Sequence, residues 1–231
     1  MLEPIVLLPG LLCDERLWDE VATALGDVAH PIPMDLSTET SIESMADCVL
    51  ARSPAEFSLA GFSMGSQVAL EIFARAPHRV RRLSLLSANA YGLTAIVQEH
   101  LSHARDHILA TGLDDYLLDA FDGYFSQARR SDQRLRQRFT DMARSLGPAT
   151  AVRQMTALLS YKGFTLGLST IGCPTTLICG ELDNRTPPSL HQSMSEAIPG
   201  SMVHIVPGSS HFTMLEAPGA VADLLRDWLN S

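Results

Sequence analysis

Three polar side chains, far apart in the chain, are of the types that together carry out acyl transfer. Ser63 lies in the stretch GFSMG, between two glycines. Asp183 lies in GELDNRTPP, and His211 lies in GSSHFTMLEAP. A serine hydroxyl alone is a weak nucleophile; it needs a base, and the base needs an acid that orients it. The sequence therefore predicts a serine nucleophile served by a histidine and a carboxylate.

The surroundings of Ser63 favour this role. The apolar run FSLA (57–60) precedes it and a helix-like run (65–76) follows it. Strand, G-x-S-x-G and helix, in this order, form a nucleophile elbow, in which the serine lies on a tight and strained turn. The helix that begins near Met64 would direct free N–H groups at an oxyanion. The alternative is an ordinary helix-capping serine in a glycine-rich turn.

The partners of Ser63 are expected just beyond later strands, because open parallel sheets bind ligands at the carboxyl ends of their strands. His211 follows the last predicted strand, whereas His204 lies inside that strand. Asp183 and Glu181 both follow the preceding strand. Asp183 lies further beyond the strand, in a turn-like segment, so it is the predicted acid and Glu181 is the reserve.

No cofactor or metal is predicted. Three histidines share one face of a predicted helix, namely His100, His103 and His107. No acid or cysteine at ligand spacing joins them, so a metal site is disfavoured. The chain contains no Walker motif and no GxGxxG after a strand, which leaves no nucleotide-binding signature.

Composition limits the classes of function. The chain has 231 residues, of which 46% are hydrophobic and 19% charged, a globular balance. Its net charge of −9 argues against nucleic-acid or anionic-membrane binding, since both require a basic surface. Its four cysteines include no CxxC pair, no apolar run approaches 18 residues, and the first residues do not resemble a signal peptide. We expect a cytoplasmic protein.

Short apolar runs alternate with amphipathic stretches, which is typical of βαβ units in a parallel sheet. The expected strands are 4–8, 28–34, 57–60, 80–87, 175–180 and 202–208. The expected helices include 15–25, 41–52, 65–76 and about 218–229. Pro31 and Pro33 assign the second strand to the sheet margin. The predicted fold class is α/β, a mostly parallel sheet of about six strands with helices on both faces.

The alternation stops over residues 89–167, which contain several helical periods and no convincing strand. One stripe at helical spacing consists of Leu135, Phe139, Met142 and Leu146. We therefore expect a single domain over 1–231, with a core of 1–88 and 168–231 and a helical insertion at 89–167.

In its three motifs and their order, serine then aspartate then histidine, the chain resembles the α/β-hydrolase fold superfamily. The resemblance covers nearly the whole chain and points to serine esterases with a small helical cap, similar to the carrier-protein methyl esterases. It implies hydrolysis of a carboxylic ester, with a small or medium apolar acyl group, through an acyl-enzyme. It makes 89–167 the cap. It also implies that the first two strands of that fold are missing.

The resemblance further implies an oxyanion hole formed by the backbone N–H groups of Leu11 and Met64. The segment LLPGLLCDERLW has Pro9 where the family usually has histidine, but it keeps Gly10. Because a backbone donor is independent of side-chain identity, we expect the hole to be intact.

Two features of the insertion have more than one interpretation. An apolar helix face either lines an acyl pocket or contacts the sheet; it is formed by Tyr116, Phe121, Tyr124 and Phe125. Residues 129–153 hold seven arginines against two aspartates. These arginines form either a solvated face or a docking surface for an acidic carrier protein, the latter using Arg130, Arg134 and Arg138.

Two other functions are compatible with the same residues. Relatives on this scaffold perform non-hydrolytic C–C cleavage or elimination, in which the histidine is the working base and water is excluded. A ligand receptor with a vestigial site is the other alternative.

Overall fold

The computed structural model describes residues 2–230, apart from the side chain of Leu166. Within them lies one parallel sheet in the order β2-β1-β3-β4-β5-β6. Its strands are β1 (Glu3–Leu8), β2 (Ala29–Pro33), β3 (Phe57–Phe62), β4 (Val80–Leu86), β5 (Thr175–Gly180) and β6 (Met202–Val206). The α/β prediction with about six parallel strands is confirmed.

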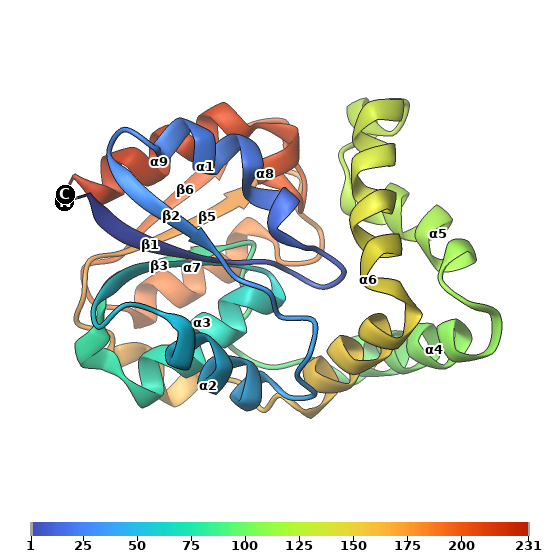
Figure 1. Cartoon of the computed structure of the whole chain (residues 1–231), viewed down its shortest axis with the longest axis horizontal. Helices are drawn as coiled ribbons and strands as arrows, with labels where there is room; N and C mark the ends of the chain where they lie inside the picture. The colour runs from blue at the N-terminus through green and yellow to red at the C-terminus, as the bar shows by residue number, and fades with distance from the viewer. Residues whose placement is uncertain (1, 231) are drawn as a thin grey trace.

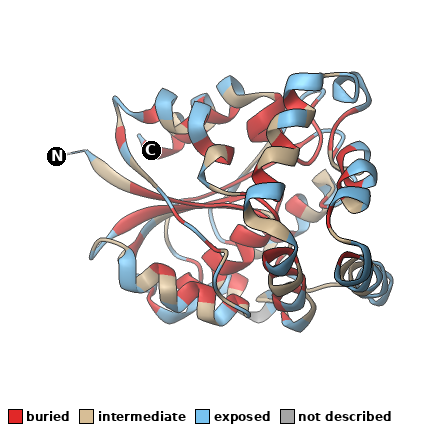
Figure 2. Cartoon of the chain, turned by 45° about the vertical axis from the view of Figure 1, so that its right-hand side comes forward, coloured by how far each residue is buried: buried red, intermediate tan, exposed pale blue. Residues whose placement is uncertain are grey.

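The burial of the strands follows their order in the sheet. Every residue of β3 and β5 is buried, since helices cover both faces of the sheet there. Strand β2 is an edge strand and only partly buried. Pro31 and Pro33, which lack the N–H that a central strand donates, lie in this edge strand as the sequence predicted. Figure 2 shows the buried sheet between the two helical layers.

Helices lie on both faces of the sheet and beyond the carboxyl ends of its strands. They are α1 (Asp19–Leu25), α2 (Ile42–Arg52), α3 (Met64–Arg75), α4 (Ala95–Thr111), α5 (Asp114–Tyr124), α6 (Gln133–Ser160), α7 (Pro188–Ala197), α8 (Thr213–Glu216) and α9 (Pro218–Leu229). Short 3₁₀ turns span Glu15–Trp18, Pro77–Arg79, Gln127–Arg129 and Thr165–Thr170. Helices α1 and α9 cover one face, and α2, α3 and α7 cover the other (Figure 1). The described residues include no helix that combines the length and apolar character needed to cross a bilayer.

Helices α4, α5 and α6 lie between β4 and β5 in the chain, beyond the carboxyl ends of the strands (Figure 1). Helix α6 is kinked at Gly147, whose φ of 76° and ψ of 170° are not helical, and Pro148 follows it. Of the predicted stripe on this helix, Leu135, Phe139 and Met142 are buried.

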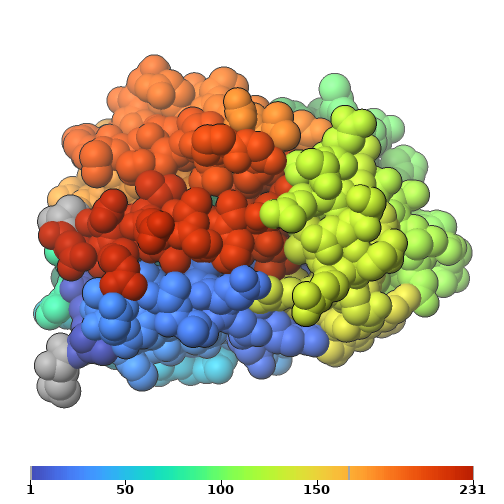
Figure 3. All heavy atoms as spheres, turned by 90° about the horizontal axis from the view of Figure 1, so that it is seen from above, coloured from blue at the N-terminus to red at the C-terminus, as the bar shows by residue number. Residues whose placement is uncertain are grey.

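Aromatic packing joins these three helices to the rest of the molecule. Phe121 and Phe125 of the α5 region stack on each other with ring centroids 4.3 Å apart. Phe125 also stacks on Phe212, and Phe139 of α6 meets Phe212 edge to face. Figure 3 shows α6, in yellow-green, directly beside the C-terminal segment, in red. The insertion therefore shares a hydrophobic cluster with the sheet layer.

Candidate active site

Ser63 lies on the single-residue turn between β3 and α3. Its φ of 51° and ψ of −113° are unfavourable for a residue with a side chain. The flanking glycines explain why the turn forms. A Cβ on Gly61 would lie 2.3 Å from the carbonyl oxygen of Gly65, and one on Gly65 would lie 2.5 Å from that of Leu8. The backbone passes so closely that only glycine fits, which raises the serine above the strand ends.

His211 follows β6 and faces the serine. Its Nε2 lies 3.1 Å from Ser63 Oγ. Two other elements hold its backbone, because its N–H donates to the carbonyl of Tyr124 at 3.1 Å and its carbonyl accepts from the Ser87 hydroxyl at 2.9 Å. With 4% of its surface exposed, the histidine is held in one orientation by both α5 and the end of β4.

Asp183 follows β5 and lies on the other side of the imidazole. Its Oδ2 is 2.9 Å from His211 Nδ1 and accepts from the Thr186 hydroxyl at 2.8 Å. Its Oδ1 accepts from the N–H groups of Arg185 and Thr186, both at 2.9 Å. Glu181 is directed elsewhere and accepts from the N–H of Gly208. The structure thus brings together Ser63, His211 and Asp183, and leaves the reserve acid apart.

The electrostatics of Asp183 determine the histidine tautomer. Burial by itself raises the pKa of Asp183, but the charge and hydrogen bond of His211 and the hydrogen bonds of Thr186 outweigh burial and hold this pKa well below its ordinary value. An ionised carboxylate only accepts hydrogen bonds. His211 Nδ1 therefore carries the proton, and the lone pair of Nε2 faces Ser63.

The backbone N–H groups of Leu11 and Met64 have no acceptor among residues 2–230. Both residues line the same cavity as Ser63. The loop that carries Leu11 is held by its neighbour Leu12, whose φ is 59° and whose N–H donates to the side-chain oxygen of Gln154 at 2.9 Å. Gln154 lies on α6, is fully buried, and also donates to the carbonyl of Leu36.

A cavity of about 640 Å³ opens at Ser63 and His211. The four aromatic residues expected to line an acyl pocket have different positions. Tyr124 lines both this cavity and a neighbouring one of about 680 Å³. Tyr116 lines only the neighbouring one of these two, together with His100, His103 and His107. Phe121 and Phe125 line neither of the two cavities and are buried in the aromatic cluster.

Several residues around the site were not singled out from the sequence. Thr186 fixes the carboxylate of Asp183, and its place three residues after that acid, in a turn, was an available signal. Arg185 lines the cavity from the same turn. Gln154 carried no sequence signal, because its partners are Leu12 and Leu36. Within residues 2–230, no group of three or more metal-ligating side chains is suitably placed for a metal ion.

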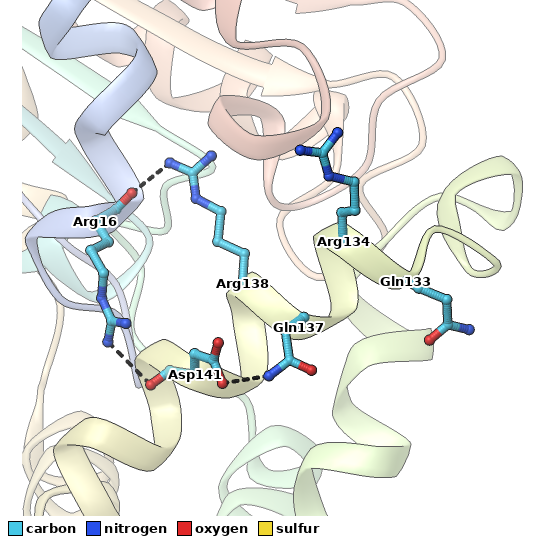
Figure 4. Close-up of a pocket in the computed structure, with 6 residues that line it drawn as sticks. All are labelled: Arg16, Gln133, Arg134, Gln137, Arg138 and Asp141. Carbon is cyan, nitrogen blue, oxygen red and sulfur yellow. Dashed lines mark hydrogen bonds between the residues drawn. The ribbon is translucent and has the colours of Figure 1, made fainter.

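The arginine-rich segment of α6 lies on a different surface. Arg134 and Arg138 line a shallow depression of about 580 Å³, shown in Figure 4, that shares no residue with the cavity at Ser63. Arg138 is engaged by the carboxylate of Glu20 and the carbonyl of Arg16. Within the described part of the chain, the guanidinium groups of Arg130 and Arg134 have neither a hydrogen-bond nor an ion-pair partner.

Comparisons with known proteins show the family and the fold of the chain. The sequence model of a family described as the alpha/beta hydrolase family matches residues 5–224. A putative 2-succinyl-6-hydroxy-2,4-cyclohexadiene-1-carboxylate synthase of Bacillus subtilis is 26% identical over 97% of this chain and 84% of its own. A pimeloyl-[acyl-carrier protein] methyl ester esterase of Nitrosomonas europaea is 24% identical over 93% of this chain and 90% of its own.

Solved structures share the fold at lower identity. The enol-lactonase of Burkholderia xenovorans superimposes with a TM-score of 0.92 at 18% identity, covering 100% of this chain and 92% of that one. A thermophilic esterase of Thermogutta terrifontis gives 0.90 at 21% identity, covering 99% and 89%. These likenesses concern the fold, whose strand ends carry the three side chains described above.

Proposed function

The chain belongs to the alpha/beta hydrolase family, and from this premise we propose that it is a serine hydrolase that cleaves carboxylic esters. Ser63 is the nucleophile, His211 the base and Asp183 the acid that orients the base. The observation that carries the proposal is the continuous hydrogen-bonded chain from Ser63 Oγ through His211 to Asp183, with contacts of 3.1 and 2.9 Å. These distances lie within the reach that proton transfer requires.

In the acylation step, Ser63 Oγ attacks the ester carbonyl while His211 Nε2 accepts the hydroxyl proton. Asp183 stabilises the imidazolium that forms and itself stays ionised. The N–H groups of Leu11 and Met64 donate to the oxyanion. One such donor contributes about 3 kcal/mol of transition-state stabilisation. His211 then gives its proton to the departing alcohol oxygen.

In the deacylation step, water replaces the alcohol. The water attacks the acyl-Ser63 carbonyl while His211 takes a proton from that water. The same two N–H groups stabilise the second oxyanion. His211 then returns the proton to Ser63 Oγ as the carboxylic acid leaves. The strained elbow keeps Ser63 Oγ at one position through both steps, so no group has to move far between them.

The test is labelling with a fluorophosphonate, followed by p-nitrophenyl ester profiling by acyl length. Wild type is expected to be labelled once, at Ser63, and Ser63→Ala is expected to lose the label and about 10⁶ in kcat. Thr94→Ala is the matched control, because Thr94 lines the same cavity with a hydroxyl that accepts the N–H of Val97 and does not hold His211. It is expected to leave the label in place. Equal labelling of wild type and Ser63→Ala would overturn the site assignment.

A non-hydrolytic reaction is the alternative, since the Bacillus subtilis relative is named a synthase. The two reactions differ in the covalent intermediate. Hydrolysis passes through an acyl-Ser63, which rapid acid quenching and mass spectrometry of the Ser63 peptide detect. Turnover of a substrate without that intermediate would favour the alternative. Ligand binding without turnover of any ester would instead favour a receptor.

A carrier-borne substrate is a further proposal, supported by relatives named as acting on a pimeloyl-[acyl-carrier protein] ester. Of the three arginines expected to dock a carrier, Arg130 and Arg134 have guanidinium groups without a partner among the described residues, whereas Arg138 is held by Glu20. Charge reversal of Arg130 and Arg134 is expected to lower turnover of an ester on an acyl carrier protein. Turnover of the same acyl ester without the carrier should be unaffected. Equal turnover of the carrier-borne ester by wild type and the double variant would reject docking here.

A further inference from the structure

We propose that the ester accepted by this cavity carries a carboxylate, and that the guanidinium of Arg185 binds it. This inference rests on the proposed hydrolase function and adds the class of substrate.

The cavity at Ser63 has a charge opposite to that of the whole chain. The chain carries −9, yet no aspartate or glutamate is among the residues that line this cavity. Arg185 is the one permanently charged residue among them. The other polar lining groups are neutral amides and hydroxyls, with His211 at the reacting position. Asp183 lies behind His211, and Asp115 and Asp119 line the neighbouring cavity, which Arg185 also lines. Because the fixed charge on the wall of the cavity at Ser63 is positive, this cavity favours an anionic ligand over a neutral one of the same shape.

The guanidinium of Arg185 has no acceptor within the chain. Other arginines of the chain form ion pairs, as Arg136 does with Asp122 and Arg144 does with Asp114. Over residues 2–230, no hydrogen bond or ion pair engages the side chain of Arg185. Its backbone N–H, rather than its side chain, donates a hydrogen bond to the carboxylate of Asp183. The five N–H donors of the guanidinium are therefore available to a ligand.

Arg185 is nevertheless held in place. Its guanidinium carbon lies 4.7 Å from the centre of the Tyr124 ring, and that ring stacks on His211 with centroids 5.6 Å apart at 26°. Gly123 makes room, because a Cβ there would come within 2.7 Å of the guanidinium. Stacking on the ring face leaves the edge of the planar group, where the N–H donors are, free for a bidentate carboxylate. Arg185 is thus positioned one ring away from the base.

The test compares paired substrates. One pair places the charge on the acyl side: p-nitrophenyl half-esters of dicarboxylic acids from succinate to suberate, against neutral branched acyl esters of the same shape. The other pair places it on the alcohol side: butyrate esters of 4-hydroxybenzoate against those of 4-hydroxyacetophenone. Wild type is expected to prefer the anionic member of one pair by about 10- to 100-fold in kcat/KM, the usual strength of a hydrogen bond to a charged group.

Arg185→Gln is expected to abolish this preference, mainly through KM, and to keep turnover of the neutral esters and labelling of Ser63. Arg185→Lys should retain part of it. Arg52→Gln is the matched control, since Arg52 is exposed on the last turn of α2 and is not among the residues that line the cavity. The inference fails if wild type has no anionic preference in either pair, or if Arg185→Gln keeps it. Loss of Ser63 labelling in wild type would instead signal failure of the hydrolase proposal.

Discussion

Two carboxylate residues, Glu181 and Asp183, follow β5, and of these two only Asp183 contacts the imidazole of His211. Asp183 is 2.9 Å from His211 Nδ1, whereas Glu181 accepts a backbone N–H of the loop after β6. Asp183→Asn is therefore expected to lower kcat by about 10⁴, the loss found when the tautomer of such a histidine is wrong. Glu181→Gln, measured on the same p-nitrophenyl ester, should leave kcat within about twofold. Comparable losses in both variants would contradict the assignment of the acid.

The lowered pKa of Asp183 also has a consequence for stability. Because this pKa lies below the unfolded value of about 3.9, the folded chain binds fewer protons than the unfolded chain between the two. The ionised carboxylate therefore stabilises the fold fully above about pH 4, and this stabilisation is lost as pH falls further. Urea unfolding of wild type and Asp183→Asn should give a free-energy difference that shrinks as the pH falls from 5 to 3. A constant difference down to pH 3 would contradict the lowered pKa.

At the scale of elements, helix α6 is connected to the loop after β1 through Gln154. Its amide oxygen accepts the N–H of Leu12 at 2.9 Å, and its amide nitrogen donates to Leu36 at 3.2 Å. Gln154→Leu removes both bonds, so the strained Leu12 turn is expected to relax and to move the Leu11 N–H off the oxyanion position. We expect kcat on a small ester to fall about tenfold with KM nearly unchanged.

Gln137→Leu, on the exposed side of the same helix, controls for the loss of an amide, because the side-chain amide of Gln137 bonds only to Asp141 within the described residues. Urea midpoints measured alongside distinguish positioning from plain destabilisation. If Gln154→Leu lowered stability and left kcat intact, Gln154 would have a structural role only.

Helix α7 is joined to the end of β4 by a buried histidine. His191 Nε2 accepts the N–H of Ala88 at 2.9 Å, and its Nδ1 donates to the carbonyl of Pro187. Burial lowers the pKa of His191. The neutral ring therefore contributes stability that is fully present above the unfolded pKa of about 6.5 and is lost as pH falls toward the lower folded value. His191→Gln, which does not titrate, should flatten the fall in urea stability between pH 7.5 and 5.5. An unchanged slope would show that His191 does not control it.

The elements themselves were largely predictable from local patterns. The motif around Ser63 predicts its own turn, because the two glycines and the apolar strand that form the turn lie within a few residues of Ser63 in the sequence. Ser41 caps α2 with Ser44 through a capping box, at the start of the helix predicted over 41–52. The acid and base were found by their places after predicted strands, since parallel strands bring their carboxyl ends to one edge. The strand order and the kink at Gly147 had no such local pattern.

At the scale of the whole molecule, the sequence left a residue's role open wherever that role depends on distant neighbours. The apolar face of α5 has one period, yet Phe121 is in the core while Tyr124 lines the cavity. The sequence does not distinguish these cases, because the difference depends on how α6 and Phe212 pack against the helix. The role proposed for Arg185 likewise depends on the ring of Tyr124, which is distant in sequence and lies against the guanidinium.

The same packing implies that the helical insertion and the sheet unfold together. Phe139 of α6 is 1% exposed and contacts the rings of Phe121, Phe125 and Phe212. Phe139→Ala leaves a cavity in this shared cluster and is expected to cost about 3–5 kcal/mol of unfolding free energy. The two tryptophans, Trp18 and Trp228, are both buried outside the insertion, so their fluorescence reports on the core.

Far-UV circular dichroism reports on all helices, including α4–α6. Wild type should give coincident urea transitions by the two probes, and Phe139→Ala should shift both to lower urea by the same amount. Leu118→Ala is the matched control, since Leu118 lies on the insertion with 64% of its surface exposed and should cost less than about 0.5 kcal/mol. If Phe139→Ala shifted only the dichroism transition and left tryptophan fluorescence unchanged, the insertion would unfold independently. The assignment of residues 1–231 to one domain would then be wrong.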